Sequence, residues 1–344
     1  MSDSRRVRSA TLGYADPLNQ LGATRDVRRN RRQPERSVRQ QGILSTPVLS
    51  VDLGGTNMRA AIVASDGQIL LRVSEPTPHD AACSDALELL MDSVRDRGGG
   101  RGSFEAVIVG LPGRVNYRAG ELEYAPNLPP SWRRELSEAN LKSHFDAEVF
   151  LANDADLAAV GETYFGAGKN FADVVYITIS TGIGAGVVLD GRVLRGMRSM
   201  VEIGHTIIAL DRLISGELAT AEELSAGPAL ARYAGSENVA ARGADLVAQV
   251  RAGDAKARAA WDRAMLAAGA TVVNLAHLFS PEVIVIGGGV GRNGKLVLDP
   301  LAQMMADHGP PAFEPPIALV EAVLGDDSGL IGGAAWPLAI GVRQ

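Results

Sequence analysis

Apolar and polar positions along the chain fall into two kinds of pattern. Short apolar runs bounded by glycine, proline or polar turns predict strands, and longer stretches with apolar residues three or four positions apart predict helices. Strands are expected at 47–51, 58–64, 69–73, 106–110, 149–152, 174–180, 185–189, 192–194, 283–286 and 317–320. Helices are expected at about 81–95, 153–165, 219–233, 243–252, 254–278, 295–307 and from 329 onward. Strands in a meander, then alternating with helices, twice over, predict two α/β lobes with mixed sheets.

The same pattern divides the chain into an N-terminal extension, a small lobe and a large lobe. Residues 47–152 are expected to form a small α/β lobe and residues 153–328 a large one, and the helix at about 329–344 is expected to pack back on the small lobe. In such folds ligands bind at the carboxyl ends of strands, here in the cleft between the lobes. Residues 1–46 lack hydrophobic periodicity and are expected to be a disordered, Arg-rich extension.

Composition narrows the class of protein. The 344 residues are 46% hydrophobic and 22% charged, which is typical of a globular protein with two domains. Cys83 is the one cysteine, so an internal disulfide and a Cys-rich zinc site are excluded. No run of 18 apolar residues and no signal-peptide pattern is present, which predicts a cytoplasmic enzyme that does not bind membranes.

Charge is distributed unevenly. The net charge is −6, but residues 1–46 contain ten arginines, no lysine and four acidic residues, a net +6, which leaves −12 for the remainder. This extension could be a basic arm for nucleic acid or a solvated tail. Two amphipathic helices of a helix-turn-helix are not predicted there, which argues against nucleic acid as a partner.

Two glycine turns, each after an apolar run, carry the most chemical information. Asp52-Leu-Gly-Gly-Thr-Asn57 follows the first predicted strand, and Ser180-Thr-Gly-Ile-Gly-Ala-Gly186 follows the strand that begins at Val174. A β-turn-β of small residues lets backbone N–H groups approach a phosphate without a Cβ in the way. Two copies predict a duplicated scaffold around a polyphosphate. Neither copy fits the P-loop or the dinucleotide-binding pattern.

Asn153-Asp-Ala-Asp156 stands between these turns, where a strand gives way to a helix. One interpretation is an N-cap with acidic residues that the helix dipole favours. The other is a carboxylate presented in the cleft to accept a proton from a hydroxyl, with the dipole keeping its pKa low. A base of low pKa suffices for a loose phosphoryl transfer.

Three further clusters are candidates for binding. Glu202-Ile-Gly-His205 could aim two polar groups at polyol hydroxyls or include a structural histidine. Asn127, in the proline-rich segment 124–130, could bind a hydroxyl or lie in an ordinary turn. The glycines at 287–291 could admit an adenine ring or start a helix.

The order of these segments resembles the ROK family of sugar kinases and repressors, within the actin-like (ribonuclease H-like) ATPase fold, from Pro47 onward. The matching segments are VDLGGTNMRAAIV (51–63), GLPG (110–113), APNLP (125–129), NDADLAAVGE (153–162), STGIGAGVV (180–188), EIGH (202–205), SAGPAL (225–230) and IGGGV (286–290). The resemblance implies a two-lobed α/β fold with an interdomain cleft, and an ATP- and Mg²⁺-dependent hexose kinase with glucose as the sugar. It also implies a homodimer or homotetramer.

The resemblance also implies roles for single residues. Asp154 would be the base that activates the 6-hydroxyl, and Asp52 would lie near Mg²⁺, through water. Sugar-binding residues would be Asn127, Asn153, Asp154, Glu202, His205 and Glu222. Nucleotide-binding residues would be Asp52, Gly54, Gly55, Thr56, Asn57, Thr181, Gly182, Gly184, Gly287, Gly288 and Gly289.

Two departures from the family pattern stand out. The Cys-rich zinc loop that follows EIGH in many members is replaced by 206–217, which has no cysteine, so no zinc site is expected. The small, glycine-rich approach to EIGH is replaced by the bulkier 198–201. Alternatives therefore stay open: another hexose or N-acetylmannosamine as substrate, polyphosphate as donor, or a sugar-responsive transcriptional regulator.

Overall fold

The computed structural model describes residues 47–97, 104, 106–199, 201–235, 243–311 and 314–341. The predicted extension at 1–46 lies outside the described residues. None of the helices in these ranges is long and apolar enough to cross a membrane.

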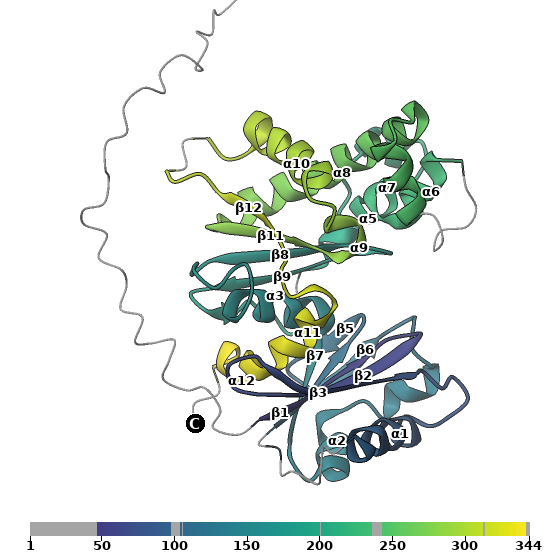
Figure 1. The fold of residues 1–344 in the computed structure, drawn as a ribbon, viewed down its shortest axis with the longest axis vertical. Coiled ribbons are helices and arrows are strands. Elements are labelled where there is room, and N and C mark those ends of the chain that lie inside the picture. The colour runs from purple at the N-terminus through teal and green to yellow at the C-terminus, as the bar shows by residue number, and fades with distance from the viewer. Residues whose placement is uncertain are drawn as a thin grey trace, which may run out of the picture. The chain divides into compact units, whose positions relative to one another are not determined.

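The first sheet has the strand order β3-β2-β1-β4-β7 (Figure 1). β1 pairs antiparallel with β2, and β2 with β3, whereas β1, β4 and β7 are parallel. The strands are β1 (Val48–Leu53), β2 (Asn57–Val63), β3 (Ile69–Pro76), β4 (Ala106–Leu111) and β7 (Glu148–Asn153). Helices α1 (Cys83–Asp96) and α2 (Glu138–Phe145) pack beside β3 and β7.

The second sheet repeats this topology, with the order β10-β9-β8-β11-β12. Its strands are β8 (Val174–Ile179), β9 (Ile183–Leu189), β10 (Arg192–Val193), β11 (Val283–Gly287) and β12 (Ala318–Glu321). In each sheet the first strand of the unit is central, its two hairpin partners lie on one side and two parallel strands on the other. The prediction of a repeated α/β unit with mixed sheets is confirmed.

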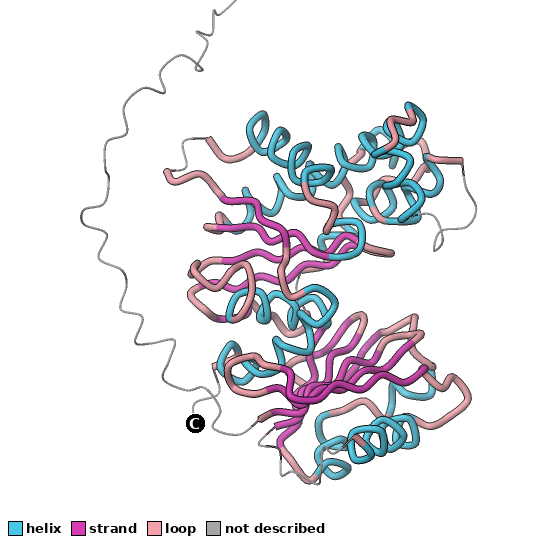
Figure 2. Tube along the Cα trace, in the orientation of Figure 1, coloured by secondary structure: helices cyan, strands magenta, loops and turns pink. Residues whose placement is uncertain are grey.

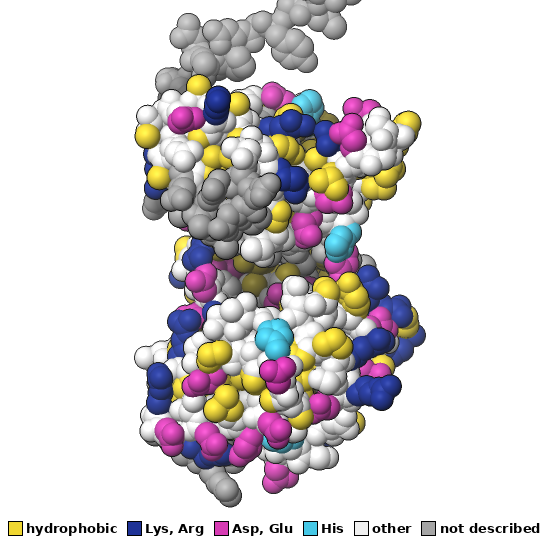
Figure 3. Space-filling view, turned by 90° about the vertical axis from the view of Figure 1, so that its right-hand side faces the viewer, with side chains coloured by type: hydrophobic (Ala, Val, Ile, Leu, Met, Phe, Trp, Pro, Cys, Tyr) yellow, Lys and Arg dark blue, Asp and Glu magenta, His cyan; other side chains and the backbone are white. Residues whose placement is uncertain are grey.

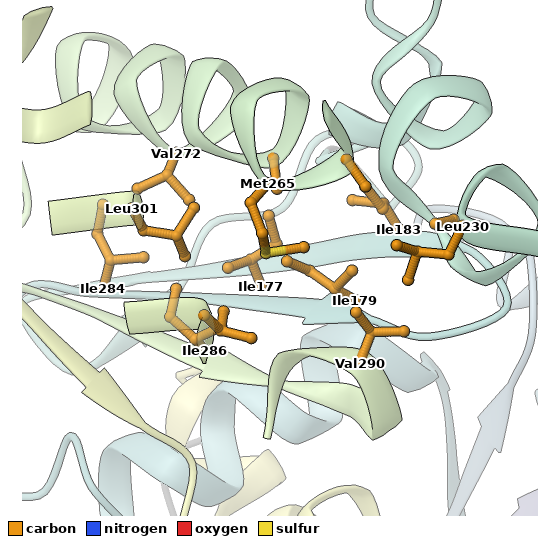
Figure 4. Packing of buried hydrophobic residues seen from close by; sticks show 14 of the residues in the cluster. Ile177, Ile179, Ile183, Leu230, Met265, Val272, Ile284, Ile286, Val290 and Leu301 are labelled. Atoms are coloured by element: carbon orange, nitrogen blue, oxygen red, sulfur yellow. The ribbon is translucent and has the colours of Figure 1, made fainter. Parts of the chain in front are cut away.

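One face of the second sheet is covered by the long helix α8 (Ala255–Phe279) and by α10 (Lys295–His308). Figure 4 shows Met265 and Val272 of α8 facing Ile177 and Ile284 of the sheet. These side chains are fully buried, so each stabilises the fold by about 1.5–3 kcal/mol of apolar burial. α8 was predicted over nearly this range, because its apolar residues recur at helical spacing.

A layer of helices lies between the two sheets (Figure 2). It consists of α3 (Asp154–Tyr164) and the C-terminal helices α11 (Ser328–Gly332), η5 (Gly333–Ala335) and α12 (Trp336–Ala339). α11 and η5 contact β1 as well as α3. α3 and α11 approach so closely that a Cβ on Gly161 would lie 2.2 Å from the Ser328 carbonyl oxygen.

The remaining described elements complete the chain. They are the hairpin β5 (Arg114–Asn116) and β6 (Glu121–Tyr124), η2 (Pro130–Arg134), η3 (Ile203–His205), α4 (Leu210–Ile214), α5 (Ala221–Ser225), α6 (Gly227–Tyr233), α7 (Gly243–Arg251), α9 (Gly288–Gly291) and η4 (Gly325–Asp327).

Two predicted helices are broken in the structure. The helix expected at 219–233 is divided into α5 and α6 at Ala226, which is extended (ψ 173°) because Pro228 supplies no N–H to continue the first helix. The helix expected from 329 onward is three short pieces, with Pro337 in the last of them. The sequence pattern also did not predict α2 or α4.

Candidate active site

A cleft of about 300 Å³ opens beside the first turn of α3, which is at the lower end of the size range of small-molecule sites. Residues from distant parts of the chain line it. They include Gly113, Arg114, Tyr124, Asn127, Asn153, Asp154, Asp156, Thr181, Gly182, Gly184, Ser199, Glu202, His205 and Glu222. All six residues predicted to bind the sugar therefore line one cleft.

Asn153 ends β7 and is the N-cap of α3. Its side-chain oxygen accepts hydrogen bonds from the backbone N–H groups of Ala155 (3.0 Å) and Asp156 (3.2 Å). Its amide nitrogen donates to the Gly113 carbonyl (2.9 Å). The predicted N-cap is confirmed, and these bonds fix the turn that carries Asp154.

Asp154 is the first residue of α3 and keeps a solvent-exposed surface in the cleft, although protein surrounds its carboxyl group. The pKa of Asp154 is raised to about 6. The larger cause is the burial of its carboxyl group, and the second is the negative charge of Asp52. The expectation of a pKa kept low by the helix dipole is therefore wrong. The bond from the Ala155 N–H lowers the pKa, but desolvation and the second carboxylate outweigh it.

Glu202 and His205 lie at the two ends of the single turn η3, with 3.8 Å between Glu202 Oε2 and His205 Nε2. The His205 side chain is 69% exposed, so it is not a buried structural histidine. Both residues line the cleft, so a ligand bound there could contact them.

Glu222 closes the cleft beside the second glycine turn. Its Oε2 accepts a hydrogen bond from the Ile183 N–H (2.8 Å), and a Cβ on Gly182 would lie 2.6 Å from the same oxygen. Gly184, which was assigned to this turn, lies within β9 instead. A Cβ there would lie 3.2 Å from Ala155 Cβ, so Gly184 also lets α3 pack on the sheet.

The first glycine turn joins β1 to β2 next to the Asn127 segment. The Gly54 N–H donates to the Asn57 carbonyl (3.0 Å), and a Cβ on Gly55 would lie 2.5 Å from the Asn127 carbonyl oxygen. Gly55 is thus required by the close approach of the two loops. Neither Asp52 nor the residues 54–57 are among the described residues that line the cleft.

Asp52 is paired with Arg59. Arg59 Nε donates to Asp52 Oδ2 (2.9 Å), and Arg59 Nη2 contacts the same oxygen. Because both contacts use Oδ2, Arg59 leaves Oδ1 of this carboxylate for another ligand. Within the described ranges, no three His, Cys, Asp or Glu side chains are grouped so as to hold a metal ion by themselves.

The third glycine segment joins β11 to α9. In the second sheet, β11 pairs with β8 on the side opposite β9. Gly288 has φ +84°, and a Cβ on it would lie 2.4 Å from the Ile179 carbonyl oxygen, so only glycine fits there. A Cβ on Gly289 would meet open space. Gly287, Gly288 and Gly289 are also not among the described residues that line the cleft.

Sequence reasoning missed two residues near Asp154. Tyr117, just after β5, donates a hydrogen bond from its hydroxyl to Asp156 Oδ2 (2.6 Å). Asp156 is 1% exposed, and burial raises its pKa to about 7 against the effect of the Tyr117 hydrogen bond. The sequence pattern marks Asp156 only as an acidic residue in the first turn of a helix, and no local pattern connects it with Tyr117.

The comparison with protein families gives one match, to the ROK family over residues 48–340. The chain belongs to the ROK family. The glucokinase of Thermotoga maritima is 30% identical over 84% of this chain and 96% of its own length. Two solved ROK structures match the fold over most of both chains.

The first of these structures is the ROK hexokinase of Thermus thermophilus, with TM-score 0.70 and 31% identity over 85% of this chain and 97% of the other. The second is a ROK family glucokinase from Streptomyces griseus in complex with glucose and AMPPNP, with TM-score 0.68 and 30% identity over 84% and 98%. These matches confirm the predicted actin-like fold class for this ROK protein.

In this ROK protein the segment after His205 has a structure of its own. It forms α4, a five-residue helix whose Leu210 and Ile214 are exposed. A hydrogen bond from the Ile208 N–H to the Ala219 carbonyl (3.0 Å) joins the backbone before α4 to the backbone after it. On the face drawn in Figure 3, acidic and basic side chains of described residues intermix.

Proposed function

We propose that this protein is an ATP-dependent hexose kinase that transfers the γ-phosphate of ATP to the 6-hydroxyl of glucose. The observation that carries the proposal is the position of Asp154 at the start of α3, in a cleft that five other polar side chains suited to sugar hydroxyls also line. The 30% identity to a glucokinase crystallised with glucose and AMPPNP supports this substrate pair.

The sugar would lie along the cleft with its hydroxyls on the side chains of both sheets' loops. Five polar side chains that line the cleft would bind the hydroxyls: Glu202, His205, Glu222, Asn127 and Asn153. Asp154 would accept the proton of the 6-hydroxyl as its oxygen attacks the γ-phosphorus. Closure of the lobes at 47–152 and 153–328 would exclude water and bring the two oxygens into line.

The phosphates of ATP would lie against the glycine turns at 54–57 and 181–184, with the adenosine near Gly287–Gly289. Mg²⁺ normally keeps several waters and binds one or two carboxylates together with substrate phosphates. Asp52 Oδ1, which Arg59 does not use, fits this requirement through a water molecule. When bound, Mg²⁺ would neutralise charge that develops on the transferred phosphoryl group.

The pKa of Asp154 predicts the acid limb of the pH profile. The base works only when deprotonated, so kcat/KM for the sugar should fall about tenfold per pH unit below pH 6 and level off above it. Asp52 and Glu202 both raise this pKa, Asp52 more. Asp52→Asn, assayed at saturating Mg²⁺ and ATP, should therefore move the limb to lower pH. A limb centred near pH 4 in the unmodified enzyme would contradict the assignment.

A panel of substrates tests the function itself. ADP release would be followed with ATP and Mg²⁺ against glucose, mannose, fructose, allose, N-acetylglucosamine and N-acetylmannosamine, with polyphosphate as a second donor. Turnover with glucose and ATP, lost when Mg²⁺ is withheld, is the expected result. Turnover only with N-acetylmannosamine, or only with polyphosphate, would correct the substrate or the donor. No turnover with any sugar would favour a sugar-binding regulator.

A further inference from the structure

The hydroxyl group of Tyr117 forms hydrogen bonds with residues on both sides of Asp154 in the sequence. It accepts a hydrogen bond from the Asn153 backbone N–H (3.0 Å) and donates one to Asp156 Oδ2 (2.6 Å). Asn153 precedes Asp154 and Asp156 follows it by two positions. One phenol oxygen therefore ties together the strand end and the helix start between which Asp154 stands.

Tyr117 is itself held firmly. It lies in the turn between β5 and β6, where the Asn116 side-chain oxygen accepts hydrogen bonds from the N–H groups of Arg118 and Ala119. The Arg195 guanidinium lies 5.3 Å from the centre of the Tyr117 ring, and the Trp336 ring lies 6.0 Å from it. The hydroxyl is thus a rigid point to which the turn at 153–156 is attached.

A buried aspartate at position 156 lowers the stability of the fold unless its carboxyl group serves a function. It is 1% exposed, and its Oδ1 has no hydrogen-bond partner among the described residues. Burying a carboxyl group with an unsatisfied oxygen costs free energy that an apolar side chain would not. The function of this carboxyl group is its hydrogen bond with Tyr117. Burial and, next, the charge of Asp156 raise the pKa of Tyr117, so the phenol keeps its proton and donates it to this bond.

We propose that Tyr117 and Asp156 form a clamp that positions the Asp154 carboxyl for proton transfer. The two are positioning residues, since they act through the backbone on either side of Asp154. This inference rests on the proposed kinase function. A displacement of about 1 Å at a reacting group can lower a rate by 10²-fold, so loss of a hydrogen bond that fixes the turn should lower kcat more than it weakens sugar binding.

The central variant is Tyr117→Phe, which removes the hydroxyl and keeps the ring. Its kcat should fall about tenfold or more, while KM for the sugar stays within about threefold. The matched control is Tyr164→Phe, at the C-terminal end of α3, which removes a phenol hydrogen bond of equal length (2.6 Å) to the Gly191 carbonyl. The control should keep its kcat. Equal losses of kcat in both variants, or none in Tyr117→Phe, would overturn the clamp.

Asp156→Asn separates the hydrogen bond from the charge. The asparagine keeps an oxygen that accepts a hydrogen bond from Tyr117, so this variant should keep more of its kcat than Tyr117→Phe does. If Asp156→Asn loses as much activity as Tyr117→Phe, the carboxyl acts through its charge and the clamp is overturned.

Amide hydrogen exchange tests the clamp without any assay of turnover. The Asn153 N–H should exchange at least about tenfold faster in Tyr117→Phe, because its hydrogen-bond acceptor is gone. Its exchange should be unchanged in Tyr164→Phe. If no sugar is phosphorylated at all, the proposed function fails, but this exchange rate still decides the clamp. Equal exchange in the unmodified protein and in Tyr117→Phe would overturn it.

Discussion

Replacing Asp154 with alanine should lower the turnover number for the sugar about 10²–10⁴-fold, the range typical of a positioned general base. With a pKa of about 6, the Asp154 carboxyl group is ionised at neutral pH and is still basic enough to accept a proton. Initial rates at saturating ATP and sugar, with KM measured separately, give this ratio. Asp154→Asn should lose nearly as much, because the amide keeps the shape of the side chain but cannot accept the proton.

The control for this loss is Asp262→Asn on α8. Asp262 is half-exposed and pairs with Arg258, one turn away and apart from the residues that line the cleft. This substitution should leave turnover unchanged. Near-normal turnover of Asp154→Ala would show that another group accepts the proton.

The second large effect is on stability. Gly161→Val should lower the free energy of unfolding by about 3 kcal/mol, because its Cβ would lie 2.2 Å from the Ser328 carbonyl oxygen and 3.1 Å from the Gly332 nitrogen. These are backbone atoms of a packed helix and cannot rotate away. Thermal unfolding should show a midpoint lower by about 5 °C or more.

Gly289→Val is the matched control for Gly161→Val. A Cβ on Gly289 would have open space around it, and its backbone is not left-handed, so the midpoint should stay within about 2 °C. A fall as large in Gly289→Val would mean that loss of glycine, and not the contact between α3 and α11, determines the effect.

Much of the fold could be predicted because its signals are local. The apolar runs that became β1, β8 and β11, and the helical spacing in α8, are written in consecutive residues. The glycine turn at 54–56 followed from its small residues and the strands on either side. Pro228 indicates a break near Ala226, but the apolar spacing continues across it and predicts a single helix.

The chemistry around Asp154 could be predicted only in part. That Asn153 caps the helix follows from residue type and position. The raised pKa of Asp154 does not, because it depends on burial in the folded protein and on Asp52, about a hundred positions away. The Tyr117–Asp156 bond likewise joins residues 39 positions apart, and neither belongs to a motif that links them.

The most direct test of the account is the identity of the phosphorylated product. ³¹P NMR would follow an equimolar mixture of ATP and glucose with Mg²⁺ and the unmodified protein. ATP should be converted to ADP and glucose 6-phosphate in equal amounts, and Asp154→Ala should slow this conversion about 10²-fold or more. Unchanged ATP, release of free phosphate, or phosphate on another hydroxyl of glucose would contradict it.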